Sequence, residues 1–200
     1  MRITGGSWRS RALKAPRGTA TRPTSDRVRE ALFSMLVASG LLPADGPADG
    51  ATDGPRVLDL YAGTGALAFE ALSRGASAAV LVESARDALA VIRQNAQALG
   101  AEKRISLFDT KVERAIPRIA GPFAIVFLDP PYADVATPAF ASVLAGAAAL
   151  VAPEGALVLE HASTDEPPAI PGLEVDRTRR YGDTTVTLYT APAKTSPMPG

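Results

Sequence analysis

The hydrophobic and polar positions of the chain follow two periods, one typical of helices and one typical of strands. In "RPTSDRVREALFSML" the apolar residues recur every three or four positions: Val28, Ala31, Leu32, Met35 and Leu36. Ser25 or Thr24 can cap such a helix, and Asp26 suits the positive end of its dipole. We therefore expect a helix over residues 25–39.

From Arg56 onward, short apolar runs alternate with amphipathic runs. Strands are predicted over 56–62, 78–84, 104–109, 123–129 and 155–161, and helices over 65–75, 85–100, 111–120 and 137–150. This alternation predicts a parallel sheet with helices on both faces. The end differs, because two alternating runs within 173–190 meet at Gly182-Asp183, which indicates a hairpin. A doubly wound, Rossmann-like α/β sheet with an antiparallel last strand is typical of class I methyltransferases that use S-adenosylmethionine.

Composition divides the chain into four expected segments. Residues 1–42 hold a small basic extension and its helix, and 43–55, rich in Pro, Gly, Ala and Asp, form a flexible connector. Residues 56–191 form the catalytic domain, and 192–200 form a disordered tail. The chain has no cysteine and one histidine, so no disulfide and no metal site is expected. Because no signal peptide or membrane-spanning run is evident, we expect a cytoplasmic protein.

Charge is distributed unevenly although the formal net charge is zero. Residues 1–30 hold eight basic and two acidic side chains, whereas the remainder holds 13 basic and 19 acidic ones. Ile3, Trp8 and Leu13 lie among the basic residues, which indicates folded structure and not a solvated tail. Arginines interleaved with an aromatic ring suit phosphates and stacked bases, so the extension predicts nucleic-acid binding.

A glycine loop, "LDLYAGTGALAFEAL", follows the first predicted strand. Gly63 and Gly65 flank Thr64 where the strand must turn into a helix, and Tyr61 belongs to the same loop. The spacing also satisfies a dinucleotide fingerprint, and Glu83 could accept ribose hydroxyls in NAD or in S-adenosylmethionine. Asp59 distinguishes the two, because a carboxylate before the glycines repels a pyrophosphate and attracts a cationic amino-acid group. The loop therefore predicts S-adenosylmethionine as the cofactor.

Asp109, at the end of the third predicted strand, and its neighbours complete the expected cofactor site. Asp109 could accept the adenine amino group, with Phe108 or Thr110 beside the ring. Asp109 lies on the sheet edge that also carries Asp59 and Glu83, where open α/β sheets bind ligands.

The stretch "DPPY" follows the fourth predicted strand, which in this fold lies beside the first. Pro130 and Pro131 fix the backbone and lack N–H groups, so the turn is rigid. Asp129 and the Pro130 carbonyl could then hold the two hydrogens of an exocyclic amine, directing the nitrogen lone pair at a methyl donor. Tyr132 supplies a face on which the base stacks. Adenine N6, cytosine N4 and guanine N2 all fit this chemistry.

Together these motifs resemble the bacterial 16S ribosomal RNA (guanine-N2)-methyltransferases of the RsmD type. The resemblance covers roughly residues 1–190 and is most specific in "RITGGSWRSRAL" and "RPTSDRVREALF". It implies guanine N2 as target, S-adenosylmethionine as methyl donor, and 16S rRNA in a partly assembled 30S subunit as substrate. Separately, we expect the protein to be a monomer. Asp129, Pro130, Pro131 and Tyr132 would form the catalytic pocket. The candidates for rRNA contact are Arg9, Arg11, Arg22, Arg27 and Arg29.

Three other functions fit parts of the pattern. A DNA adenine-N6 or cytosine-N4 methyltransferase would share "DPPY", but the chain shows no obvious target-recognition domain. A non-catalytic RNA-binding assembly factor would not need Asp129 and Tyr132. An NAD oxidoreductase would share the glycine loop. His161, at the end of the fifth strand, is interpreted as structural or exposed.

Overall fold

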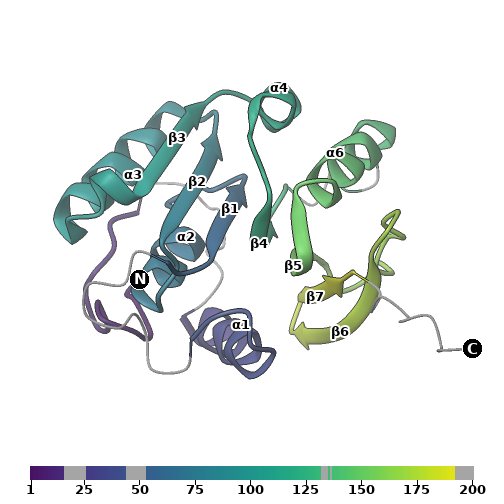
Figure 1. The fold of residues 1–200 in the computed structure, drawn as a ribbon, viewed down its shortest axis with the longest axis horizontal. Helices are drawn as coiled ribbons and strands as arrows, with labels where there is room; N and C mark the ends of the chain where they lie inside the picture. The colour runs from purple at the N-terminus through teal and green to yellow at the C-terminus, as the bar shows by residue number, and fades with distance from the viewer. Residues whose placement is uncertain (16–25, 44–52, 132–134, 136, 192–200) are drawn as a thin grey trace, which may run out of the picture.

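A computed structural model describes residues 1–15, 26–43, 53–131, 135 and 137–191. Its centre is a seven-stranded sheet in the order β3-β2-β1-β4-β5-β7-β6 (Figure 1). The parallel strands are β1 (Arg56–Leu60), β2 (Ala78–Glu83), β3 (Ile105–Asp109), β4 (Phe123–Leu128) and β5 (Val151–Ala162). β6 (Glu174–Tyr181) and β7 (Thr184–Thr190) form the hairpin, with β7 antiparallel to β5. The predicted fold class is confirmed.

Helices cover both faces of the sheet. One face packs against α1 (Asp26–Ala38), α2 (Ala66–Ser73) and α3 (Arg86–Leu99), and the other against α4 (Val112–Ala115) and α6 (Pro138–Ala148). Two short 3₁₀ helices, η1 (Glu102–Arg104) and η2 (Ile116–Arg118), precede β3 and β4. In the described parts of the chain, no helix combines the length and apolarity needed to cross a bilayer.

Most elements begin or end within two residues of their predicted bounds, and three differences are notable. β1 ends at Leu60, because Tyr61 adopts a left-handed conformation with φ 64°. The helix predicted over 111–120 divides into α4 and η2, where Pro117 at the start of η2 lacks the N–H that a continuous helix needs. β5 begins at Val151, four residues early, and its pairing with β4 shifts register between Phe123 and Ile125. Thr24, Ser25, 44–52 of the connector and the tail 192–200 lie outside the described residues.

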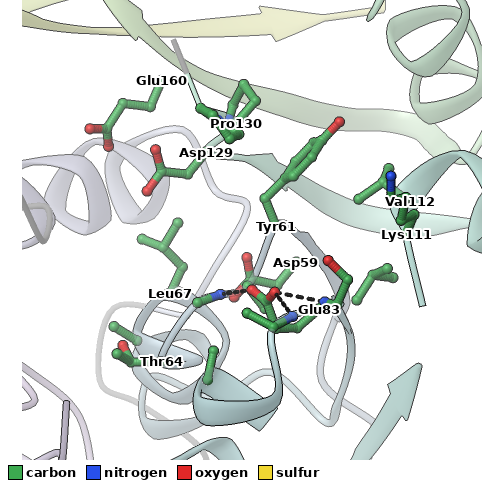
Figure 2. A pocket seen from close by; sticks show the side chains of 18 of the residues that line it. Asp59, Tyr61, Thr64, Leu67, Glu83, Lys111, Val112, Asp129, Pro130 and Glu160 are labelled. Carbon is green, nitrogen blue, oxygen red and sulfur yellow. Dashed lines mark hydrogen bonds between the residues drawn. The ribbon is translucent and has the colours of Figure 1, made fainter. Parts of the chain in front are cut away.

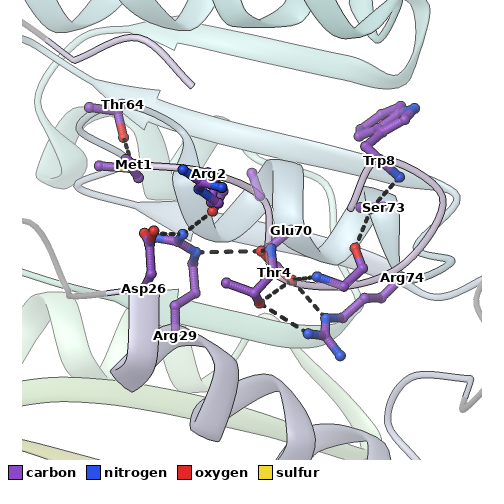
Figure 3. Close-up of polar contacts among 12 residues, drawn as sticks. Met1, Arg2, Thr4, Trp8, Asp26, Arg29, Thr64, Glu70, Ser73 and Arg74 are labelled. Atoms are coloured by element: carbon purple, nitrogen blue, oxygen red, sulfur yellow. Dashed lines mark hydrogen bonds and ion pairs between the residues drawn. The ribbon is translucent and has the colours of Figure 1, made fainter. Parts of the chain in front are cut away.

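The first fifteen residues are folded against α2, as the apolar residues among them predict. Ile3 and Leu13 are buried in the same core as α1 and the sheet. Glu70 of α2, itself buried, accepts hydrogen bonds from the backbone N–H groups of Thr4 and Gly5, both at 2.8 Å (Figure 3). Gly6 has φ 74°, and a Cβ there would lie 1.9 Å from the Ser73 carbonyl oxygen, so only glycine fits. The basic extension and the sheet therefore share one hydrophobic core.

Candidate active site

A cavity of about 910 Å³ opens at the carboxyl edge of the parallel strands (Figure 2). Its wall combines residues at or after the ends of five neighbouring strands, β3, β2, β1, β4 and β5, with the β6–β7 turn, Met1 and Arg29 of α1. The predicted site residues found in this wall are Asp59, Tyr61, Gly63, Thr64, Glu83, Thr110, Asp129, Pro130 and Pro131. The sheet thus brings the cofactor loop and the proline corner into one space, as expected at the switch point of an open α/β sheet.

The glycine loop is held open toward the cavity by its backbone conformation. Gly63 and Gly65 have positive φ values of 55° and 77°. A Cβ at Gly65 would lie 2.6 Å from the Phe69 ring, so only glycine allows the tight turn into α2 at this position. Among the described residues Gly65 is not part of the cavity wall, so its contribution is to shape the loop.

Glu83 organises the loop from the end of β2. One carboxylate oxygen accepts from Gly63 N at 2.8 Å, and the other accepts from Ser84 N and Ala85 N at 2.6 and 2.8 Å (Figure 2). These bonds fix a carboxylate at the cavity wall, where the remaining lone pair can accept a hydrogen bond from a ribose hydroxyl.

Asp59 lies at the back of the cavity, 1% exposed, and accepts from Ala68 N of α2 at 3.1 Å. Burial raises the pKa of this carboxyl group to about 7, the Ala68 bond opposes the rise, and the charge of Glu83 adds to it. Asp59 therefore caps α2 and also presents a carboxyl group that a positively charged ligand would help to ionise.

Asp109 is not brought into the cavity. Its side chain is 62% exposed, and its carboxylate lies 3.9 Å from the guanidinium of Arg93 on α3. β3 is the outermost strand on this side, so Asp109 points to solvent and toward α3. Thr110 does line the cavity, and its N–H bonds the Glu83 carbonyl oxygen at 3.0 Å. The predicted adenine contact of Asp109 is thus not supported by this geometry.

The proline corner follows β4 directly. Asp129, Pro130 and Pro131 line the cavity, whereas Tyr132 lies outside the described residues. Phe127 of β4 packs in the core on the α1 face. Because residues two apart on a strand point to the same side, Asp129 is directed to that face as well.

Glu160 is a cavity residue that the sequence interpretation missed. Its side chain is 8% exposed. Leu128 pairs with Leu159, so Asp129 and Glu160 follow side by side on neighbouring strands, and Figure 2 shows both carboxylates in the same part of the cavity. Asp183 and Thr184 of the β6–β7 turn line the same space. The signal for Glu160 is its place at the end of the apolar run "GALVLE", which corresponds to the place of Asp129 at the end of "FAIVFLD".

Arg29 is directed inward, unlike the other candidates for rRNA contact among the described residues, and it belongs to the cavity wall. Its side chain is 0% exposed and lies 2.8 Å from Asp26 and 3.4 Å from Glu70 (Figure 3). The helical period turns this residue inward, while Arg27, two positions earlier, stays exposed. Arg9 and Arg11 are exposed too, with Arg11 donating to the Ala98 carbonyl. Arg22 lies outside the described residues.

His161 is structural. It is fully buried, and Nε2 lies 3.0 Å from the Thr187 hydroxyl oxygen while Nδ1 lies 3.0 Å from the Ala162 carbonyl oxygen. This agrees with the interpretation from sequence.

The sheet order, the closing hairpin and the acidic cavity define a methyltransferase of the S-adenosylmethionine-dependent class. The fold is similar to that of "Putative methyltransferase yhhF" from Escherichia coli, with a TM-score of 0.78 and 29% identity over 96% of this chain and 97% of the other. The chain belongs to the family described as "Conserved hypothetical protein 95", whose model matches residues 1–190.

Two relatives are similar to this chain over most of its length. The "Putative rRNA methyltransferase YlbH" of Bacillus subtilis (strain 168) is 35% identical over 193 residues, which cover 94% of this chain and 98% of the relative. The "Ribosomal RNA small subunit methyltransferase D" of Escherichia coli (strain K12) is 37% identical over 132 residues, 66% of this chain and 60% of the relative. The resemblance inferred from the motifs is confirmed at the level of the family.

Proposed function

We propose that this chain methylates the exocyclic N2 amine of a guanine in 16S rRNA, within a partly assembled 30S subunit. One observation carries the proposal: a single cavity joins the glycine loop and Glu83 to Asp129, Pro130 and Glu160. The two relatives, one named as a putative rRNA methyltransferase and the other as a ribosomal RNA small subunit methyltransferase, support the class of substrate.

The residues present fit S-adenosylmethionine. Glu83 would offer carboxylate oxygens to the ribose, Gly63 and Thr64 line the cavity beside it, and Thr110 lines the same cavity and could flank the adenine ring. Burial raises the pKa of Asp59 to about 7. A cationic ligand would lower this pKa again, because positive charge stabilises the ionised carboxylate, and the two charges would attract each other. The cofactor supplies an electrophilic methyl group on its sulfonium.

The proline corner prepares the nucleophile. The lone pair of an exocyclic amine is delocalised into the base, so it attacks poorly in water. Asp129 and the Pro130 carbonyl oxygen can each accept one amine hydrogen, which orients the nitrogen and stabilises the positive charge that develops on it. Pro130 and Pro131 lack N–H donors, so no backbone donor from these two residues competes for the acceptors.

The pair Asp129 and Glu160 favours guanine among the three bases. Beside its N2 amine, guanine carries an N1–H donor, which a second carboxylate can accept. Adenine and cytosine carry an unprotonated ring nitrogen beside their amines, and a buried carboxylate such as Glu160 would repel that lone pair. The arrangement of two acceptors therefore matches the donor edge of guanine.

The test compares two carboxylate variants of the purified protein. Asp129→Asn should keep S-adenosylmethionine binding and lose methyl transfer to unmodified 30S subunits by a factor on the order of 10²–10⁴. Asp109→Asn is the matched control, because its carboxylate lies at the same sheet edge but outside the cavity. Equal turnover in Asp129→Asn, or preferential labelling of genomic DNA by the parent protein, would refute the proposal, and nucleoside mapping identifies the methylated base.

A further inference from the structure

The β6–β7 hairpin carries positive charge outside the cavity. Arg177, Arg179 and Arg180 lie in β6, and the last two are exposed while Arg177 is half-buried. Within the described ranges none of the three forms an ion pair, whereas Arg29 and Arg74 both pair with Glu70. The segment after residue 30 is net acidic, so three arginines on one strand without an ion-pair partner among the described residues are a local concentration of positive charge.

The β6–β7 hairpin places these arginines near the rim of the cavity. β7 runs antiparallel to both β5 and β6, so β6 runs in the direction of β5 and ends at the same carboxyl edge. The residues that follow in the turn, Asp183 and Thr184, are part of the cavity wall. Arg180 Nε donates to the Gly182 carbonyl oxygen at 3.2 Å and so belongs to the turn itself.

The register of the hairpin decides which side of the sheet the arginines occupy. Arg177 pairs with Leu188 and Arg179 with Val186, and both apolar partners lie in the core that contains α1. Residues directly opposite each other on paired strands point to the same face. Arg177 and Arg179 therefore lie on the α1 face of the sheet, the face to which Asp129 is directed. Figure 1 shows the hairpin at the end of the sheet opposite β3.

We propose that Arg177 and Arg179 contact phosphates of the rRNA substrate, on the flank of the cavity opposite the first fifteen residues. The inference rests on the proposed function, because it takes RNA as the substrate. A base that enters the cavity must leave its stack, and phosphate contacts hold the strand in register while it does so. Arginines at the rim suit this task, since phosphate contacts position nucleic acid without reading its sequence.

The experiment measures the salt dependence of binding to unmodified 30S subunits and to protein-free 16S rRNA. The variant Arg177→Gln/Arg179→Gln removes two charges from the hairpin. Its control, Lys103→Gln/Arg118→Gln, removes two charges from exposed positions in η1 and η2, which precede β3 and β4 and lie at the amino edge of the sheet. Thermal unfolding and S-adenosylmethionine binding verify that both variants are folded.

For the hairpin variant, the slope of log K against log salt should flatten by about 0.7–0.9 for each phosphate that the removed arginines neutralise in the parent protein. At 0.1 M salt this corresponds to roughly a 5- to 8-fold weaker affinity per phosphate. The control variant should match the parent protein in slope and in affinity.

The outcomes separate this inference from the proposed function. If the parent protein binds and methylates rRNA while the hairpin variant retains its slope, the inference is refuted and the proposed function stands. If the parent binds neither form of rRNA, both are refuted. A parent protein that is dimeric and becomes monomeric in the hairpin variant, with unchanged RNA affinity, would refute the inference and show instead that β6 pairs with a second copy.

Discussion

Asp59→Asn should make the free energy of unfolding less sensitive to pH and should raise it in mild alkali. Burial raises the pKa of this carboxyl group from its ordinary 3.8 to about 7, so the folded chain holds the proton more tightly than the unfolded chain. The resulting stabilisation is complete below about pH 4 and is lost as the pH rises through about 7. The full difference corresponds to about 4 kcal/mol, of which about 3 kcal/mol is lost between pH 5 and pH 8.

Asparagine has nearly the same shape as aspartic acid, keeps an oxygen for Ala68 N and does not ionise. The variant should therefore match the parent below about pH 4, and its advantage in stability should grow by about 3 kcal/mol between pH 5 and pH 8 in the absence of cofactor. Urea unfolding of both proteins at several pH values measures this difference, since other titrating groups cancel between them. Parallel stability curves would refute the reasoning, because they would mean that Asp59 does not titrate between pH 5 and pH 8.

Two further substitutions test the residues that shape the site. Glu83→Gln should weaken S-adenosylmethionine binding by about 1.5–3 kcal/mol, tenfold or more, because an amide accepts weaker hydrogen bonds than a carboxylate. Calorimetric titration measures the affinity, with Asp109→Asn as the control. Equal affinities in the two variants would contradict a role for Glu83 in cofactor binding. Glu70→Ala should lower the free energy of unfolding by about 3–5 kcal/mol, because Arg29 and Arg74 lose the carboxylate with which both pair. Urea unfolding measures this change, and a loss below about 1 kcal/mol would show that the Glu70 ion pairs do not stabilise the fold.

The architecture could be predicted because buried parallel strands are continuous apolar runs and the hairpin has its own turn signal. Leu58, Val80 and Val126 stand in such runs, and all pack between the sheet and a layer of helices. The early start of β5 could not be predicted, because Pro153 and Gly155 interrupt its apolar pattern. That start depends on the irregular pairing of Val151 with Phe123, which is a property of the neighbouring strand.

The candidate site was predictable where spacing carries chemistry, as for Asp59, Glu83 and Asp129. It was not predictable where burial decides. Arg27 and Arg29 lie two positions apart on α1, and the orientation of the helix buries one while exposing the other. The partner that accommodates Arg29 is Glu70, 41 residues away, and nothing local to α1 indicates it.

The bonding of the first fifteen residues constrains the order in which the chain can be assembled. Thr4 bonds a side chain 66 positions ahead, and Lys14 N bonds Asn95 Oδ1, 81 positions ahead. During translation these early amides emerge long before their acceptors and stay hydrated until α2 and α3 have been synthesised. Docking of the leading segment is consequently a late event, and protection of Thr4 and Lys14 from deuterium exchange would report that the first half of the polypeptide has matured.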